Sequence, residues 1–419
     1  MSLSSRLKHH ASHWVRLLPG QGQGLRRMVQ QARASWKARQ KARAAAASGW
    51  RLPDPDRVLE LAPSDIVGHT HLQPAAGPPR ELRNAVFGHD VLPGAVIGGD
   101  WDLDVPPFEA LAAYRSIEQR VRTGVSWRET DYFKESMRDI ESGRPLWNCR
   151  NADELEARLC YIDGVVDSVR QHGLRRQRDV TAAQDPTRRW SDEAEVNIGR
   201  DGAILFQDGR HRMAIAKVLG VPVIPVKVRV RHLLWQKLRE QLLDLRRPTS
   251  AGALLAWPAP HPDLADIACD AAGAAALAAL LPRLPAPQVR VLDLEGRLGF
   301  VTHHLLARGD TVSTVEPDIV LRGLGERLAT RGRTGYAWSS GPPAEVGAHD
   351  VVLAVGAGPS APRGADGDAK LHALLRGLDA RVGWAATLSG DAPGPAPGAS
   401  AWAKLPGGWT LWGRPPVPT

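Results

Sequence analysis

The segment 204–220 constrains the fold of this chain more than any other part of the sequence. An apolar run ends at Asp208 and Gly209, which form a turn dipeptide, and apolar residues then recur at helical spacing up to Gly220. A second apolar run, 222–228, predicts another strand. The segment therefore predicts a strand, a glycine turn, a short helix and a further strand in direct succession.

Basic side chains gather at the predicted start of this helix. Arg210, His211 and Arg212 directly follow Gly209, where the first N–H groups of a helix have no partner within it. Free N–H groups beside cationic side chains bind phosphate-sized anions. Residues 208–212 therefore predict an anion site, unless they form an ordinary turn in which Arg212 pairs with a carboxylate and His211 is a satisfied boundary histidine.

Positive charge is concentrated at the N-terminus. The sequence carries 54 Lys and Arg against 45 Asp and Glu, but residues 1–50 hold ten of the basic side chains and no acidic one. The remainder therefore holds 44 basic and 45 acidic side chains, which is not the composition of a nucleic-acid-binding domain. Residues 1–48 are expected to form a basic helical extension. It either contacts a membrane surface, a nucleic acid or an acidic partner, or lies against the body.

The cysteines and the hydropathy pattern indicate the compartment. Cys149, Cys160 and Cys269 lack the spacing of a zinc site or a disulfide framework, which fits a reducing environment. The longest nearly apolar run, 271–281, is too short to span a bilayer, and no cleavable signal is evident. We therefore expect a cytoplasmic protein with no transmembrane segment.

Several domains follow the basic extension. Residues 49–245 would form a first domain closed by a helix over 232–245, and the proline-rich segment 246–262 would be a linker. Residues 263–419 alternate between strand-like and helical runs, which predicts a parallel α/β sheet, with a final hairpin around residues 407–408. The fold class is therefore α/β and α+β multidomain.

The order of elements over about 150–232 is similar to that of the ParB/sulfiredoxin family. A helix with a glycine stop precedes two strands, and Gly209 and Arg212 match the family's Gly-x-x-Arg element, with the small residues Ala214 and Ala216 after it. The Asp-Gly-x-His-Arg version resembles that of ParB-like nucleases and related small-molecule kinases. The resemblance implies an α+β domain that binds a nucleoside triphosphate with Mg²⁺, and phosphoryl transfer or hydrolysis on a small molecule.

This resemblance gives each residue of the turn a role. Gly209, Arg210 and Arg212 would bind the phosphates, with Arg212 as a bidentate clamp. Asp208 and His211 are the candidate catalytic residues; Asp208 is also the candidate Mg²⁺ ligand, and His211 would act near neutral pH. Arg210 stands where sulfiredoxin has its catalytic cysteine, so sulfinic-acid repair is not expected. No helix-turn-helix region follows, which disfavours a role in chromosome partitioning.

A second glycine turn follows the strand predicted over 288–294. It contains Asp293, Glu295, Gly296 and Gly299, and Glu316 ends the next predicted strand. Over about 263–390 the chain resembles a class I S-adenosylmethionine-dependent methyltransferase. The resemblance implies a Rossmann-like doubly wound sheet with the cofactor over the carboxyl ends of its strands and Glu316 at the ribose hydroxyls.

One position departs from the methyltransferase pattern. Glu295 stands where the first glycine of the turn belongs, and it adds bulk and negative charge there. Gly296 would take over through a one-residue shift. The resemblance also places Asp350, at the start of the fourth strand, near the methyl donor.

Asp100 and Asp102 flank Trp101 after a pair of glycines. Such a polar cluster is typical of the edge of a binding site, where backbone approaches a ligand closely. It is equally typical of a bulge closed by Asx turns, with Trp101 in a core. The sequence leaves both interpretations open.

Three functions follow from these observations. The favoured one is a nucleotide-dependent phosphotransferase or hydrolase that acts on a small molecule through residues 208–212. The second is an S-adenosylmethionine-dependent methyltransferase whose first domain selects the substrate. The third is a non-catalytic ligand-binding protein localised by its basic extension.

Overall fold

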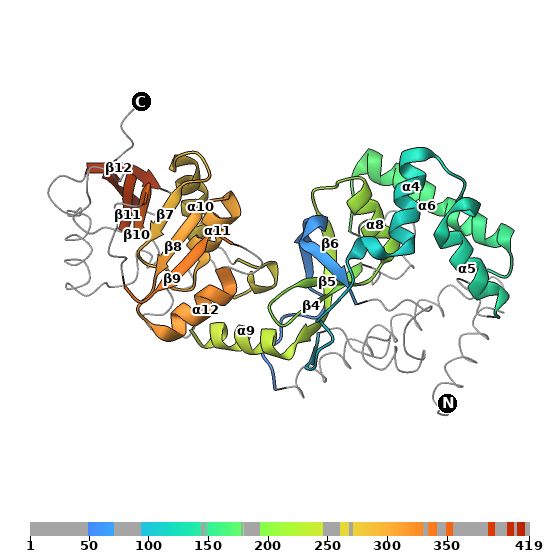
Figure 1. The fold of residues 1–419 in the computed structure, drawn as a ribbon, viewed down its shortest axis with the longest axis horizontal. Coiled ribbons are helices and arrows are strands. Elements are labelled where there is room, and N and C mark those ends of the chain that lie inside the picture. Colours follow the sequence, from blue (N-terminus) through green and yellow to red (C-terminus); the bar gives the residue numbers. More distant parts are fainter. Residues whose placement is uncertain are drawn as a thin grey trace, which may run out of the picture. The chain divides into compact units, whose positions relative to one another are not determined.

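The chain divides into two compact units, Met1–Leu233 and Leu234–Thr419 (Figure 1). The structure is a computed structural model, and it describes residues 49–70, 94–143, 147, 149–176, 179, 193–245, 260–267, 271–329, 334–341 and 349–354, and three strands at 384–389, 400–405 and 409–414. The basic extension and most of the expected linker lie outside these residues. Within the described part of the chain, no helix is long and apolar enough to cross a membrane.

A mixed sheet organises the first unit. Its strands lie in the order β1, β6, β4, β5, β2, and β3 also pairs with β6. Their bounds are β1 (Val58–Leu61), β2 (Ile66–His69), β3 (Ala95–Ile97), β4 (Ala194–Ile198), β5 (Ile204–Asp208) and β6 (Ile224–His232). β4 and β5 form the antiparallel hairpin that the sequence predicts, while β4 and β6 are parallel.

The first unit also contains helices, and capping residues in the sequence mark where some of them begin and end. The described helices of the unit are α4 (Ala112–Thr123), α5 (Asp131–Glu141), α6 (Ala152–His172) and α8 (Arg210–Val218). The Asn151 side chain caps α6 by accepting a hydrogen bond from the Glu154 N–H at 2.9 Å, and Gly173 ends the helix with φ +69°. α8 packs against α4 and begins directly after Gly209.

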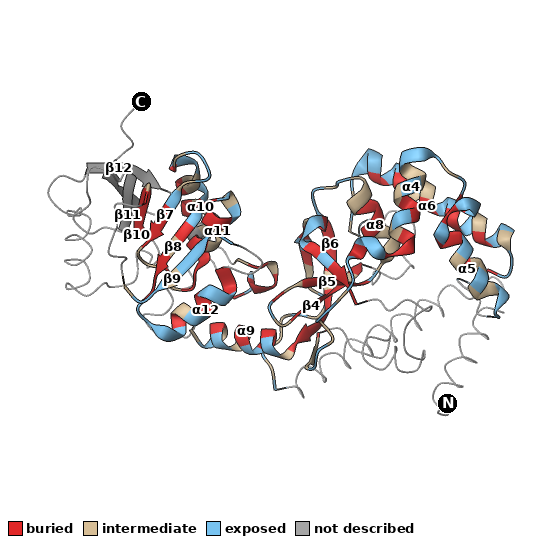
Figure 2. Cartoon of the chain, in the orientation of Figure 1, coloured by how far each residue is buried: buried red, intermediate tan, exposed pale blue. Residues whose placement is uncertain are grey.

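The core of the first unit lies between the sheet and these helices. The α8 residues 213–216 are all buried, as are all residues of β6 except the partly buried Lys227. The rings of Phe206 on β5 and Phe108 meet edge to face at 4.9 Å. Figure 2 shows the buried residues running along β4, β5 and β6 and along one side of the helices.

A mostly parallel sheet organises the second unit. Its described strands lie in the order β12, β13, β11, β10, β7, β8, β9. Their bounds are β7 (Arg290–Asp293), β8 (Thr311–Val315), β9 (Tyr336–Ser339), β10 (Val351–Ala354), β11 (Trp384–Ser389), β12 (Ser400–Leu405) and β13 (Trp409–Arg414). The five strands that are neighbours in the order β11, β10, β7, β8, β9 are all parallel. β13 is antiparallel to both of its neighbours, β11 and β12. Because chain order reverses between β7 and β10, the sheet is doubly wound with its switch point there.

The described helices of this unit are α9 (Leu233–Leu245), α10 (Ala271–Leu280), α11 (Phe300–Arg308) and α12 (Ile319–Ala329). α11 packs against β8 and α12. α9, which we expected to close the first domain, makes buried contacts within the second unit instead. The fully buried Arg239 side chain lies 3.5 Å from an Asp263 oxygen and 2.7 Å from an Asp266 oxygen.

The structure confirms a mixed α/β chain with parallel strands in the second unit. The hairpin β12–β13 lies where residues 407–408 predicted one. We did not predict α12, although Leu321, Leu324 and Leu328 recur at helical spacing and are buried. The signal for β9 is faint because the strand has only four residues. The ParB/sulfiredoxin-like character of the first unit and the exact domain bounds stay predictions.

Candidate functional site

The turn after β7 is anchored by a buried carboxylate. Asp293 Oδ2 accepts a hydrogen bond from the Thr302 hydroxyl at 2.9 Å, and Oδ1 accepts one from the Glu295 N–H at 3.2 Å. Burial raises the pKa of Asp293 to about 6, although these two hydrogen bonds act in the opposite direction. Asp293 therefore holds the turn from within the fold and does not face a ligand directly.

Two glycines allow this turn to close over the sheet. The Gly296 N–H donates to the Val315 carbonyl at 2.9 Å, and an added Cβ would lie 2.2 Å from Thr314 Cγ2. Gly299 has φ +68°, and its Cβ would lie 2.7 Å from that of Ala329. The close approach is thus made by Gly296, while Glu295 beside it is partly exposed.

Glu316 lies directly after β8, beside the same turn. Its Oε2 accepts the Arg297 N–H and its Oε1 accepts the Asp318 N–H, both at 2.9 Å. The residue is only 3% exposed. Each carboxylate oxygen has two lone pairs, so each keeps the capacity for a second hydrogen bond. The two contacts fix the carboxylate at the carboxyl edge of the sheet.

Asp350 lies at the opposite edge of this sheet. Its carboxylate pairs with Arg290, at the start of β7, at 3.0 Å. Because β7 and β10 are parallel, both residues stand at the amino ends of their strands. The expectation that Asp350 lies near a methyl donor is therefore wrong, since a ligand of a doubly wound sheet lies at the carboxyl ends.

In the first unit, the turn at Gly209 is built as the sequence predicts. Gly209 has φ +86°, and an added Cβ would lie 3.0 Å from the Ala194 Cα on β4, so only glycine fits without strain. The exposed Asp208 accepts the Gly209 N–H through Oδ1 at 2.7 Å. Across the described residues, no group of three His, Cys, Asp or Glu side chains could hold a metal ion. Asp208 would thus need ligand oxygens to complete a Mg²⁺ site.

Arg212 has a protein partner in this turn. Its Nη1 lies 3.0 Å from Glu193, whose side chain is 3% exposed, and its Nη2 donates to the Arg175 carbonyl at 3.2 Å. A buried carboxylate needs a charged partner, so this ion pair is part of the fold. The predicted role of Arg212 as a phosphate clamp competes with it.

His211 also has a hydrogen-bond partner within the protein. Its Nε2 lies 2.8 Å from the Tyr132 hydroxyl. Burial, reinforced by the positive charges of Arg210 and Arg158, lowers the pKa of His211 to about 3. The imidazole is therefore neutral at neutral pH, which argues against the acid/base role that the sequence suggested for it there.

Arg210 remains as the cation without a carboxylate partner among the described residues. Arg158 on α6 is likewise without an ion pair in the described part of the chain, and its guanidinium lies 5.9 Å from the Trp147 ring. We did not predict Tyr132, Trp147 and Arg158 as site residues from the sequence. Their only signal is a set of aromatic and basic residues on separate segments, which the fold alone brings together.

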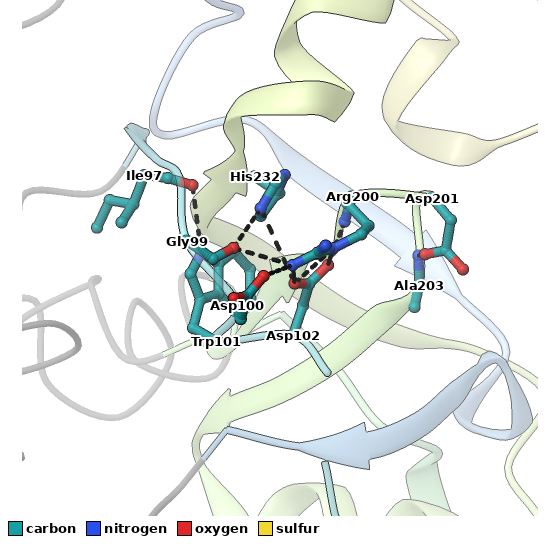
Figure 3. A network of polar contacts seen from close by, with 9 residues as sticks. All are labelled: Ile97, Gly99, Asp100, Trp101, Asp102, Arg200, Asp201, Ala203 and His232. Carbon is teal, nitrogen blue, oxygen red and sulfur yellow. Dashed lines mark hydrogen bonds and ion pairs between the residues drawn. The ribbon is translucent and has the colours of Figure 1, made fainter. Parts of the chain in front are cut away.

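Asp100 and Asp102 are held by Arg200 (Figure 3). The Arg200 Nη2 lies 2.8 Å from Asp100 and 2.9 Å from Asp102, and the Asp102 side chain is 2% exposed. Burial alone would raise the pKa of Asp102, but its hydrogen bonds from Arg200 outweigh this and lower it. Nearby, His232 Nε2 lies 2.8 Å from the Gly99 carbonyl oxygen. The ion pairs of Arg200 join the loop after β3 to the β4–β5 hairpin. They favour a structural role for Asp100 and Asp102 over a place at the edge of a binding site.

Several solved structures that are similar to part of this chain are methyltransferases. One is an S-adenosylmethionine-dependent methyltransferase from Agrobacterium tumefaciens (TM-score 0.20, 16% identity, 26% of this chain and 41% of that one). Another is a putative one from Listeria monocytogenes (TM-score 0.23, 18% identity, 28% and 52%). A third is magnesium protoporphyrin IX methyltransferase from Synechocystis with bound SAH (TM-score 0.26, 14% identity, 33% and 78%).

The chain spans less than two thirds of the length of the Agrobacterium and Listeria proteins. At such TM-scores and identities, the similarity is no basis for assigning a function. No protein-family model matches the sequence, and no curated protein matches it significantly.

Proposed function

We propose that the protein is an S-adenosylmethionine-dependent methyltransferase whose second unit binds the cofactor. The observation that carries this proposal is the position of Glu316. Its carboxylate stands at the carboxyl edge of a doubly wound sheet, beside the glycine turn that follows β7, and β7 is one of the two strands at the switch point. Ligands of such sheets bind at this place.

The residues fit the ribose end of the cofactor. A ribose offers two neighbouring hydroxyl donors, and Glu316 has a free lone pair on each of its oxygens after accepting the Arg297 and Asp318 N–H groups. Bound cofactor would supply a methyl group activated on a sulfonium. The chain's own residues would bind and orient it, and the first unit would select the small-molecule substrate.

The structure of the turn limits the expected affinity. The N–H groups of Leu294, Glu295 and Gly296 already donate within the protein, so the cofactor carboxylate gains no hydrogen bonds from them. Glu295 adds negative charge nearby. We therefore expect a dissociation constant in the micromolar range or weaker, about −8 kcal/mol or less favourable.

Calorimetric titration of the full chain with S-adenosylmethionine tests the proposal. Glu316→Ala should weaken binding at least about tenfold, since a hydrogen bond to a charged group contributes about 1.5–3 kcal/mol. Glu326→Gln, which changes an exposed carboxylate on α12, is the matched control and should bind as wild type does. If only Glu295→Gly binds the cofactor, the wild-type chain is not a methyltransferase.

A second candidate function is binding of a nucleoside triphosphate by the first unit, with phosphoryl transfer or hydrolysis as its reaction. The observation that favours it is Arg210, a cation at the start of α8 with no carboxylate partner among the described residues. Gly209 and Arg210 would contact the phosphates, and Asp208 a Mg²⁺ ion. Loss of Mg²⁺-dependent triphosphate binding in Arg210→Ala is the expected result. Arg212→Ala is a poorer test because it leaves Glu193 buried without its partner.

The third function, a non-catalytic ligand-binding protein, would be favoured if S-adenosylmethionine or a triphosphate binds but an activity assay with the bound ligand shows no turnover. In that case deletion of residues 1–48 should abolish association with liposomes or nucleic acid if the basic extension localises the protein. Unchanged association in the deletion variant would contradict that role.

A further inference from the structure

Three aromatic rings meet beside the start of α8. The Tyr132 and His211 rings lie 5.6 Å apart, and the Trp147 ring lies 6.1 Å from the first and 5.5 Å from the second. Tyr132 comes from α5 and His211 from α8, and Trp147 lies between α5 and α6 in the chain. The first two are held by their mutual hydrogen bond, so they form a fixed support for the third.

Trp147 is the exposed member of this ring cluster. It is 36% exposed, whereas Tyr132 is 5% exposed. Tyr161 on α6 extends the aromatic surface and is 60% exposed. The Arg158 guanidinium lies between these two, 5.9 Å from the Trp147 ring and 5.2 Å from the Tyr161 ring. Exposed aromatic side chains that lie close together offer a surface on which a ligand or a partner can pack.

The surroundings of the ring cluster carry a net positive charge. Arg158 and Arg210 both lie close enough to Tyr132 and His211 to act electrostatically on each of them. The charge of Glu135 acts on the pKa of Tyr132 in the opposite direction to the two arginines, and more weakly than either of them. Neither arginine forms an ion pair within the described part of the chain. Arg158 therefore flanks the exposed Trp147 and Tyr161 rings, and Arg210 lies near the Tyr132 and His211 rings against which Trp147 packs. Such an arrangement suits a planar ligand that also carries negative charge.

We propose that Trp147 and Arg158 form a base-stacking subsite for a nucleotide whose phosphates lie at Arg210. The base would stack on the exposed Trp147 ring, as bases do on aromatic side chains, and the Arg158 guanidinium would lie beside it. This inference rests on the nucleotide-binding candidate for the first unit. It adds the recognition of the base, which residues 208–212 do not provide.

The test compares nucleotides with a phosphate chain that has no base. ATP, CTP and inorganic tripolyphosphate are each titrated into the full chain with Mg²⁺. ATP or CTP should bind at least tenfold more tightly than tripolyphosphate. Trp147→Ala should remove about tenfold of that nucleotide affinity, because base stacking contributes about 1–3 kcal/mol per base. It should leave tripolyphosphate binding unchanged, and Trp147→Phe should restore most of the nucleotide affinity.

Arg158→Gln should weaken nucleotide binding, while Arg170→Gln serves as the matched control. Arg170 lies on the same helix, is exposed and pairs with Asp167. Nucleotide affinity that is unchanged in Trp147→Ala, or tripolyphosphate binding that falls equally, would overturn the stacking subsite. If tripolyphosphate binds through Arg210 but the base adds no affinity, only this inference fails. If no probe binds the wild-type chain, the nucleotide candidate fails with it.

Discussion

We expect the buried His211 to make the stability of the first unit depend on pH. The His211 pKa is about 3 in the folded chain and about 6.5 when unfolded. Between these values the unfolded state binds a proton that the folded state does not. The contribution of His211 to stability is therefore complete above pH 6.5 and is lost as the pH falls toward 3.

Replacing His211 with a side chain that does not titrate should remove this dependence. The stability advantage of wild type over His211→Gln is expected to shrink by on the order of 3 kcal/mol between pH 7 and pH 4. Urea unfolding at several pH values measures the difference. A constant difference across that range would show that His211 titrates normally in the folded chain.

The contribution of Asp293 to stability should change with pH in the opposite direction to that of His211. Its folded pKa of about 6 exceeds the usual value of 3.8, so the folded state binds a proton first as the pH falls. Wild type should therefore gain stability relative to Asp293→Asn on acidification from pH 7.5 to pH 4, by about 2–3 kcal/mol. Parallel stability curves for the two proteins would contradict the raised pKa.

Among the elements, α9 combines a buried apolar face with a buried ion pair. Arg239 is fully buried among Asp263 and Asp266, and the Trp235 indole N–H also donates to Asp263 at 2.9 Å. Removing one partner of a buried pair leaves an uncompensated charge. This contact explains why α9 belongs with the second unit, although its sequence pattern favoured the first.

Arg239→Ala should destabilise the second unit by about 3–5 kcal/mol. Lys237→Ala changes an exposed side chain on the same helix and should cost less than about 0.5 kcal/mol. Denaturant unfolding of both variants measures the contrast. Equal effects for the two substitutions would mean that the buried pair contributes nothing specific to this helix.

Elements with a strong local signal were predictable from the sequence. Gly209 and Gly173 end their elements through positive φ, and glycine at such positions is visible in the sequence. The partners of Arg212, Asp102 and Arg239 were not predictable, because each pair joins residues that are distant in the chain. The same limit hid the ring cluster of Tyr132, Trp147 and His211. Periodicity identifies elements, whereas ion pairs and rings depend on how the elements pack.

At the scale of the whole molecule, the two units each have their own sheet and buried core. Such units are expected to unfold in separate transitions. Scanning calorimetry of the full chain should resolve two transitions, of which Arg239→Ala lowers one and leaves the other in place. A single transition that shifts as a whole would contradict this independence.

We propose that the second unit binds S-adenosylmethionine through Glu316, and calorimetric titration of the full chain is the decisive measurement. We expect one binding site in wild type, binding at least about tenfold weaker in Glu316→Ala, and wild-type affinity in Glu326→Gln. Absence of binding to the wild-type chain, or equal affinity in wild type and Glu316→Ala, would contradict it.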